Sequence, residues 1–229
     1  MYTGHKDIVQ YEIPEGFTVV GKHAFGNKCK YLTKVILPEG ITKIEEEGFI
    51  NYYSLEEINF PSSLTHVGYA AFHRCAQLKI TTNNAKLLDI GEHAFNGCCK
   101  IESMILSDDI ELINNSAFND CRNLKSINLS NKIRSIGREA FLLCEKIKEI
   151  YIPDSVLEIK QNAFKYCKEL EEISLPQDIK LGVNAFGKSK GIPSYREVYI
   201  YIYIYIYIYK CKYNIQIKTT KSAKKEKEI

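Results

Sequence analysis

The stretch IRSIGREAFLLCEKIKEIYIP, residues 133–153, contains the pattern that decides the fold. An Ala-Phe pair, Ala140 and Phe141, is preceded by Ile136 and followed by Cys144, and the stretch ends in the alternating segment KEIYIP. Alternation of apolar and polar residues over a few positions is typical of a short strand with one buried face. The stretch therefore predicts one strand and one buried turn.

This pattern recurs along the chain at a nearly constant period. The spacings between the aligned phenylalanines are 24, then 23 five times, then 22. The aligned residues are Phe25, Phe49, Phe72, Phe95, Phe118, Phe141, Phe164 and Phe186. Most units also keep an apolar residue five positions before the Phe, a Cys three positions after it and a strand that ends at a Pro. Since one such unit cannot bury its own apolar face, the period predicts a stack of units, a solenoid.

The unit reads LxxIxLPxxVxxIGxxAFxxCxx, and over residues 8–192 it resembles the BspA-type leucine-rich repeats. The resemblance implies a leucine-rich-repeat solenoid, a right-handed stack of units of about 23 residues. It implies a short-stranded parallel sheet on one face, with turns and short helical segments on the other. It also implies the role of a surface adhesin or recognition scaffold that binds other proteins.

The chain divides into three expected segments. We expect residues 1–7 to form a partial N-terminal lid, residues 8–201 the solenoid of about eight units, and residues 202–229 a low-complexity Tyr/Ile strand with a Lys-rich disordered tail. The alternating run Tyr199–Tyr209 begins in register as a further strand and is apolar on both faces, which predicts self-association through this C-terminal edge strand. A truncated family member without a function of its own is an open alternative.

Composition and charge limit the class of partner. Contents of 45% hydrophobic and 26% charged residues are typical of a soluble folded protein. The net charge is +3, and residues 210–229 hold seven Lys and two Glu, which leaves 3 − 5 = −2 for residues 1–209. Because nucleic-acid binding needs a basic face on the folded part, the sequence argues against that partner. It also contains no run of the roughly 18 apolar residues that a membrane span needs.

Two locations stay open on the sequence. The N-terminal segment MYTGHKDIVQ lacks the basic and apolar regions of a secretory signal, which predicts a cytoplasmic protein. The family resemblance implies the cell surface instead.

The residues that could carry chemistry have simpler structural interpretations. Six of the eight Cys lie in the repeat register, which predicts a ladder of small buried side chains; no CxxC motif suggests zinc. Cys99 and Cys211 lie outside the register and are expected to be the more reactive thiols. The position two before each Phe holds many residue types, including His23 and His93, and is therefore expected to be exposed. We expect no catalytic, cofactor or metal site.

Glycine recurs four positions before the Phe, where it suits a tight turn.

One unit departs from the repeat pattern in its strand. In the segment KITTNNAK, residues 79–86, the inward positions fall on polar residues. We expect the strand in this unit to be weak or slipped, so that Ile80 is used.

A protein-binding face is predicted from the outward strand positions, which vary while their inward neighbours do not. Exposed apolar members such as Ile36, Ile105 and Tyr151 are the expected anchors, because such groups dominate binding hot spots. The candidate residues are Lys34, Ile36, Glu57, Asn59, Ile105, Asn128, Glu149, Tyr151, Glu172 and Ser174. The sequence does not identify the protein that they bind.

Overall fold

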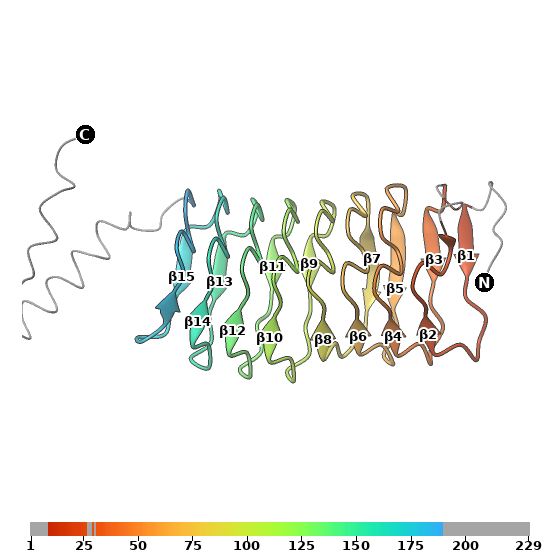
Figure 1. Ribbon diagram of the computed structural model, residues 1–229, viewed down its shortest axis with the longest axis horizontal. Coiled ribbons are helices and arrows are strands. Elements are labelled where there is room, and N and C mark those ends of the chain that lie inside the picture. Colours follow the sequence, from red (N-terminus) through yellow and green to blue (C-terminus); the bar gives the residue numbers. More distant parts are fainter. Residues whose placement is uncertain (1–8, 27–28, 30, 190–229) are drawn as a thin grey trace, which may run out of the picture. The chain divides into compact units, whose positions relative to one another are not determined.

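The computed structural model describes residues 9–26, 29 and 31–189, apart from the side chain of Glu172. Each unit contributes two short strands, and the paired strands of successive units all run parallel. In Figure 1 the odd-numbered strands form one row and the even-numbered strands a second row. The described residues are therefore a β-solenoid. The expected lid and the Tyr/Ile strand with its Lys-rich tail lie outside them, so the segment boundaries stay predictions.

The first strand series is the one that the alternating segments predict. Its members are β1 (Gln10–Glu12), β3 (Lys34–Ile36), β5 (Glu57–Phe60), β7 (Lys79–Asn83), β9 (Ser103–Met104), β11 (Ser126–Ile127), β13 (Glu149–Tyr151) and β15 (Glu172–Ser174). They form three sheets, ordered β1-β3-β5-β7, β9-β11 and β13-β15. The series is thus interrupted twice, between β7 and β9 and between β11 and β13.

A second strand series takes the place of the expected helical segments. Its members are β2 (Val19–Val20), β4 (Lys43–Ile44), β6 (His66–Val67), β8 (Asp89–Ile90), β10 (Leu112–Ile113), β12 (Ser135–Ile136), β14 (Glu158–Ile159) and β16 (Lys180–Leu181). The apolar residue five positions before the Phe is the inward residue of each. The expected turns are present, but of the expected short helical segments residues 9–26, 29 and 31–189 contain no α-helix and a 3₁₀ residue only at Gly26.

The aligned phenylalanines form one continuous column through the core. Neighbouring ring centroids lie 5.0–5.5 Å apart. From Phe49 to Phe164 every aligned ring is fully buried. Offset stacking at this spacing adds to the free energy that burial of the rings provides. The stack of units that the period predicts is confirmed.

The irregular unit contains a β-bulge. Ile80 pairs with Ile58, whereas the next paired positions are Thr82 and Asn59, so Thr81 is an extra residue in β7. The prediction that the strand slips to use Ile80 is confirmed. The alternative that it is weak is wrong, because β7, with five residues, is the longest described strand.

The turns around the phenylalanines from Phe49 to Phe164 form a third ladder of hydrogen bonds. The backbone N–H of Phe118 donates to the carbonyl of Ala140 in the next unit at 2.9 Å, and the N–H groups of Ser116 and Asp120 also donate to that unit. Ser116 and Asp120 have positive φ values of 52° and 59°. A left-handed residue on each side of the Phe turns alternate N–H groups toward the same neighbouring unit.

The backbone conformation at the position two before the Phe influences which residues occur there. It has φ between 49° and 58° in every aligned unit. Histidine and asparagine adopt this conformation more readily than most residues, which accounts for His23 and His93. The prediction that the position is exposed is confirmed only for His23 and Asn184; it is wrong for Ala70 and Ser116, which are buried, and the other four residues are half-buried.

The recurring glycine four positions before the Phe serves close packing between units. A Cβ on Gly68 would lie 2.6 Å from the backbone nitrogen of Glu46, and one on Gly182 would lie 2.4 Å from that of Gln161. These glycines have no positive φ, but each begins a tight turn, as predicted: the N–H of Ala71 donates to the carbonyl of Gly68 at 3.3 Å. The missing side chain lets the backbones of adjacent units touch.

Truncating one ring of the column should destabilise the protein strongly. Phe118 stacks on Phe95 and Phe141 at 5.5 Å and is fully buried. We expect Phe118→Ala to lower the free energy of unfolding by about 3–5 kcal/mol, measured by urea denaturation followed by circular dichroism. Tyr151→Ala, at an exposed position, is the control and should cost about 0.5 kcal/mol or less. Equal losses in the two variants would contradict the role of the column.

Candidate functional site

The outward side of the first strand series carries the predicted binding residues and is called here the strand face. Alternation is clear in β13, where Ile150 is 6% exposed and Tyr151 is 60% exposed. Tyr151 pairs with Ser174 across β13 and β15, as the predicted columns require. The structure leaves Ile36, Ile105, Asn128, Glu149, Tyr151 and Ser174 exposed, and it half-buries Lys34, Glu57 and Asn59. Glu172 lies beside Glu149 in the register.

Lys34 and Glu57 form an ion pair between β3 and β5, with Nζ and Oε2 2.9 Å apart. Both side chains remain partly exposed, so the pair contributes about 1 kcal/mol or less. Its main effect at this end of the strand face is to neutralise both charges.

Asn59 and Asn128 use their amides within the solenoid. The amide of Asn59 accepts from the backbone N–H of Leu37 and donates to its carbonyl, both at 2.8 Å. Asn128 makes the same pair of bonds with Leu106, at 2.7 and 3.2 Å. These two candidates therefore have a structural role that the outward pattern does not reveal.

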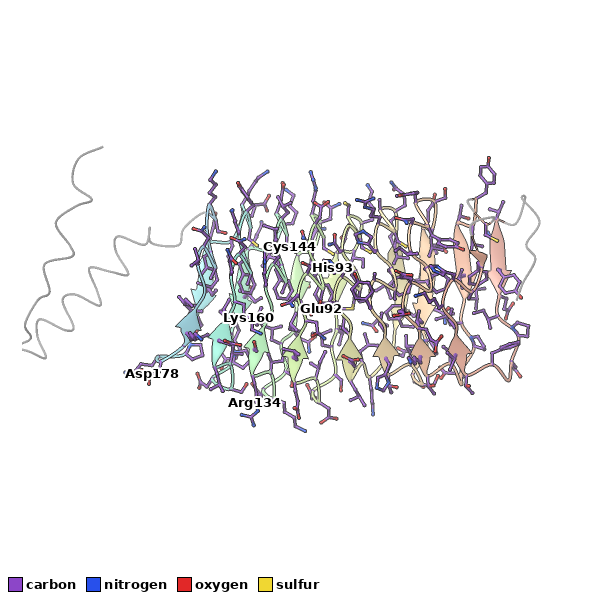
Figure 2. The ribbon with its side chains drawn as sticks, in the orientation of Figure 1. Glu92, His93, Arg134, Cys144, Lys160 and Asp178 are labelled. Atoms are coloured by element: carbon purple, nitrogen blue, oxygen red, sulfur yellow. The ribbon has the colours of Figure 1, made fainter. Side chains whose placement is uncertain are left out.

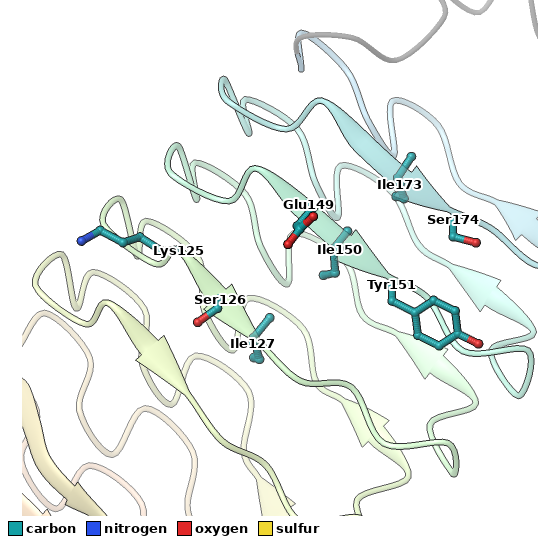
Figure 3. Close-up of a pocket in the computed structure, with 8 residues that line it drawn as sticks. All are labelled: Lys125, Ser126, Ile127, Glu149, Ile150, Tyr151, Ile173 and Ser174. Atoms are coloured by element: carbon teal, nitrogen blue, oxygen red, sulfur yellow. The ribbon is translucent and has the colours of Figure 1, made fainter.

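A hollow lies in the strand face where β11 and β13 are not paired. It has a volume of about 490 Å³. Its lining residues are Lys125, Ser126, Ile127, Glu149, Ile150, Tyr151, Ile173 and Ser174 (Figure 3). No backbone hydrogen bond joins β11 to β13, whose residues are all described. Three predicted residues, Glu149, Tyr151 and Ser174, thus meet at one concave site.

The residue that follows each strand is related to the length of the strand. Strands before Pro38, Pro61 and Pro153 have three or four residues, because the residue before a proline is held in an extended conformation. β11 has only two residues and leads to Ser130 instead. The Ser130 hydroxyl accepts from the N–H of Lys132 at 3.0 Å, which bends the chain locally. The short β11 pairs with β9 on one side and leaves the edge of β13 unpaired on the other.

Exposed apolar residues also occur on the second strand series, where the sequence suggested none. Leu112 lies in β10, and Leu157, which is 61% exposed, precedes β14. The sequence could have revealed this exposed residue, because the position that holds Leu157 is occupied by the polar Arg134 in the preceding unit. Figure 2 shows Arg134 at the rim of the stack.

The register cysteines are donors in the core. The thiols of Cys75, Cys98, Cys121, Cys144 and Cys167 each donate to the carbonyl of the Phe 26 residues earlier, at 3.0–3.2 Å. Figure 2 shows Cys144 within the body of the stack. The Ser189 hydroxyl makes the equivalent bond to Phe164 at 2.7 Å, and the Tyr52 hydroxyl donates to Gly26. The predicted ladder of buried Cys is thus also a ladder of hydrogen bonds.

Burial keeps these thiols protonated. It raises the pKa of Cys75 and of Cys167 to about 12 and also raises the pKa of Cys121. Cys99 is the least buried of the described cysteines, but burial and then the charge of Asp120 raise its pKa too. Its predicted reactivity is therefore not supported by an activated thiolate, and Cys211 lies outside the described residues.

The histidines do not gather into a metal-binding cluster. His23 Nε2 lies 3.1 Å from Glu47, and the rings of His73 and His93 are 6.3 Å apart. No group of three or more His, Cys, Asp or Glu residues suited to a metal ion occurs in the part of the chain that the structure describes. Within that part there is also no helix with the length and apolarity to cross a bilayer.

Comparison with known proteins identifies the repeat. A family model described as "BspA type Leucine rich repeat region (6 copies)" matches residues 1–111 and 89–216. No curated protein matches the chain.

Solved structures share the fold. A leucine-rich repeat protein from Bacteroides ovatus ATCC 8483 is 27% identical with a TM-score of 0.71, and the match covers 80% of this chain and 50% of that chain. A leucine-rich repeat protein from Eubacterium ventriosum ATCC 27560 is 24% identical with a TM-score of 0.55, over 81% of this chain and 44% of that chain. The chain thus spans about half the length of these two proteins.

The buried thiols predict a loss of stability at alkaline pH. Unfolded thiols ionise near pH 8.5, whereas folded Cys75 and Cys167 hold their protons to about pH 12. The folded state therefore binds more protons between these values, and the stabilisation is complete below pH 8.5 and lost as the pH rises. Each thiol should remove up to about 1.4 kcal/mol of unfolding free energy per pH unit in this range.

Urea titrations at pH 7 to 11 would measure this effect. Cys121→Ser retains a donor for the Phe95 carbonyl but does not ionise in this range. The free energy of unfolding of this variant should therefore fall less steeply with pH, by the contribution of one thiol. An unchanged slope in Cys121→Ser would show that the thiol does not carry the effect.

Proposed function

The chain belongs to the BspA-type leucine-rich repeat family, and on this premise we propose that it is a non-catalytic scaffold that binds another protein through its strand face. The observation that carries the proposal is the contrast between the two sides of the first strand series. The inward residues are apolar and buried, whereas their outward neighbours vary from unit to unit. A fixed core with a variable surface is suited to recognition.

The exposed apolar residues give this face its anchors. Ile105 is 62% exposed, Tyr151 is exposed to a similar degree, and both belong to the column that also contains Ile36. Large apolar and aromatic side chains contribute most of the binding energy at protein interfaces. Because Lys34, Glu57 and the two asparagines are engaged within the solenoid, we assign recognition mainly to Ile36, Ile105, Glu149, Tyr151 and Ser174, with Glu172 beside them in the register.

The hollow supports binding better than it supports catalysis. An enzyme needs convergent groups with activated protonation states in its cleft. The hollow contains one carboxylate, one ammonium group, a phenol and two hydroxyls, and its lining includes neither His nor Cys. Loss of a reproducible turnover on replacement of a single Cys or His would favour an enzyme instead.

We propose the cell surface as the location, on the family resemblance, with an intracellular adaptor as the alternative. The free thiols of the described cysteines favour the intracellular alternative, because disulfides are common in oxidising compartments. Labelling of intact cells with an impermeant reagent separates the two: protection of all copies would exclude the surface location.

The predictions about other partners rest on the sequence. Nucleic acid is disfavoured by the charge of −2 that 3 − 5 leaves for residues 1–209. Self-association through Tyr199–Tyr209 remains a prediction, because that run lies outside the described residues.

Site-specific crosslinking tests the strand face. A photoreactive phenylalanine at Ile105 should capture a protein partner from cell or matrix extracts, because this position is exposed on the proposed binding face. The same residue at Leu157, which directly precedes β14 of the second strand series, should not. The two positions are matched, since both are apolar and they are 62% and 61% exposed.

The adducts would be identified by mass spectrometry. Competition by unlabelled protein, but not by an Ile105→Asp variant, should abolish the Ile105 adduct. Capture from Leu157 alone, or equal capture of the same protein from both positions, would contradict binding through the strand face.

A further inference from the structure

The hollow between β11 and β13 has an apolar floor and a polar wall. Ile127 and Ile173 are partly buried beneath it, and Glu149 and Tyr151 stand on the outward side of β13. Figure 3 shows the side chains of Glu149 and Tyr151 following one another along this strand. Residues two apart on a strand lie about 6.6–6.8 Å apart on the same face. A carboxylate and an aromatic ring are thus held a fixed distance apart above an apolar surface.

The charge at this site is acidic, unlike that of its equivalent elsewhere on the strand face. In β3 and β5 the paired positions hold Lys34 and Glu57, which neutralise each other at 2.9 Å. In β13 and β15 the equivalent paired positions hold Glu149 and Glu172, both acidic. Within the described residues Glu149 has no ion-pair partner. The lysine that neutralises Glu57 thus has no counterpart at Glu149, so a cation bound there would be stabilised.

The lysine that lines the hollow does not supply that cation. Lys125 forms an ion pair with Glu102, with Nζ and Oε2 2.7 Å apart. Figure 3 shows its side chain extending away from Glu149 and Tyr151. The acidic wall is therefore available to a group from outside the chain.

Tyr151 determines which cation fits best. The residue is 60% exposed, and its side chain has no ring contact or hydrogen bond with the described residues. An exposed aromatic face attracts cations, and the planar guanidinium group stacks on it while donating two parallel hydrogen bonds to a carboxylate. The aliphatic part of an arginine side chain would cover Ile127 and Ile173.

We propose that the hollow is a subsite for an arginine side chain of the protein partner, an inference that rests on the proposed function of the strand face. Glu149 binds the guanidinium group, the ring of Tyr151 stacks against it, and the two isoleucines contact its methylene groups. The same acidic wall repels the phosphates of a nucleic acid.

NMR of the protein with 13C-labelled isoleucine methyl groups tests the subsite directly. The probe is N-acetyl-arginine amide, and its uncharged counterpart is N-acetyl-citrulline amide. We expect the methyl signals of Ile127 and Ile173 to shift and saturate with the arginine probe but not with the citrulline probe. Glu149→Gln should weaken binding about tenfold or more, because it removes a charge-assisted hydrogen bond. Tyr151→Leu should weaken it about two- to fivefold.

Glu57→Gln is the matched control. It removes a carboxylate at the equivalent register position, where Lys34 already neutralises the charge, and it should leave binding of the probe unchanged. The inference is overturned if the two methyl signals do not respond, if the citrulline probe shifts them equally, or if Glu57→Gln weakens binding as much as Glu149→Gln does. Tighter binding of N-acetyl-lysine amide would overturn the choice of arginine.

The crosslinking and NMR experiments can fail separately. Capture of a partner from Ile105 uses no arginine probe. If the partner is captured but the hollow does not bind N-acetyl-arginine amide, this inference alone is overturned. Saturable arginine binding without capture from the strand face would overturn the proposed function instead.

Discussion

Contact between the phenylalanine rings of neighbouring units is the constraint on which the structure depends. Each ring obtains its burial from the rings on either side, so a unit cannot be stable without its neighbours. The chain must also return to the same point after each circuit, which fixes the period. The one longer spacing, from Phe25 to Phe49, is absorbed without breaking the column, since these rings still lie 5.4 Å apart but are inclined by 28°. Everything on the surface is positioned by this column.

Much of this architecture could be predicted, because burial leaves a periodic record in the sequence. The Phe column, the first strand series and the use of Ile80 follow from apolar residues that recur in register. The second strand series was missed because two residues are too few to show alternation. The left-handed turns were missed for a different reason: at Ala70 and Ser116 the backbone conformation is repeated while the side chain is not. Variable side chains there suggested exposure, although the position is buried in both units.

The candidate site was predictable only in part. The sequence identifies which side chains point outward, but the hollow arises from the absence of pairing between β11 and β13, which alternation within a single strand does not record. Side-chain bonds to the backbone were equally invisible, as Asn59 shows. The donor role of the cysteines could have been recognised, because Cys75, Tyr52 and Ser189 occupy one repeat position and all carry a hydrogen that can be donated.

Hydrogen bonding around the phenylalanines makes the boundaries between units alike from Phe49 to Phe164. Phe118 donates its N–H to the unit that follows and receives the thiol of Cys144 from that same unit, and the pattern recurs along the stack. Duplication or loss of one whole unit would therefore create no new type of junction. Gene-level recombination in steps of one unit can change the length of the stack and reassort its surface columns, while the core chemistry stays the same.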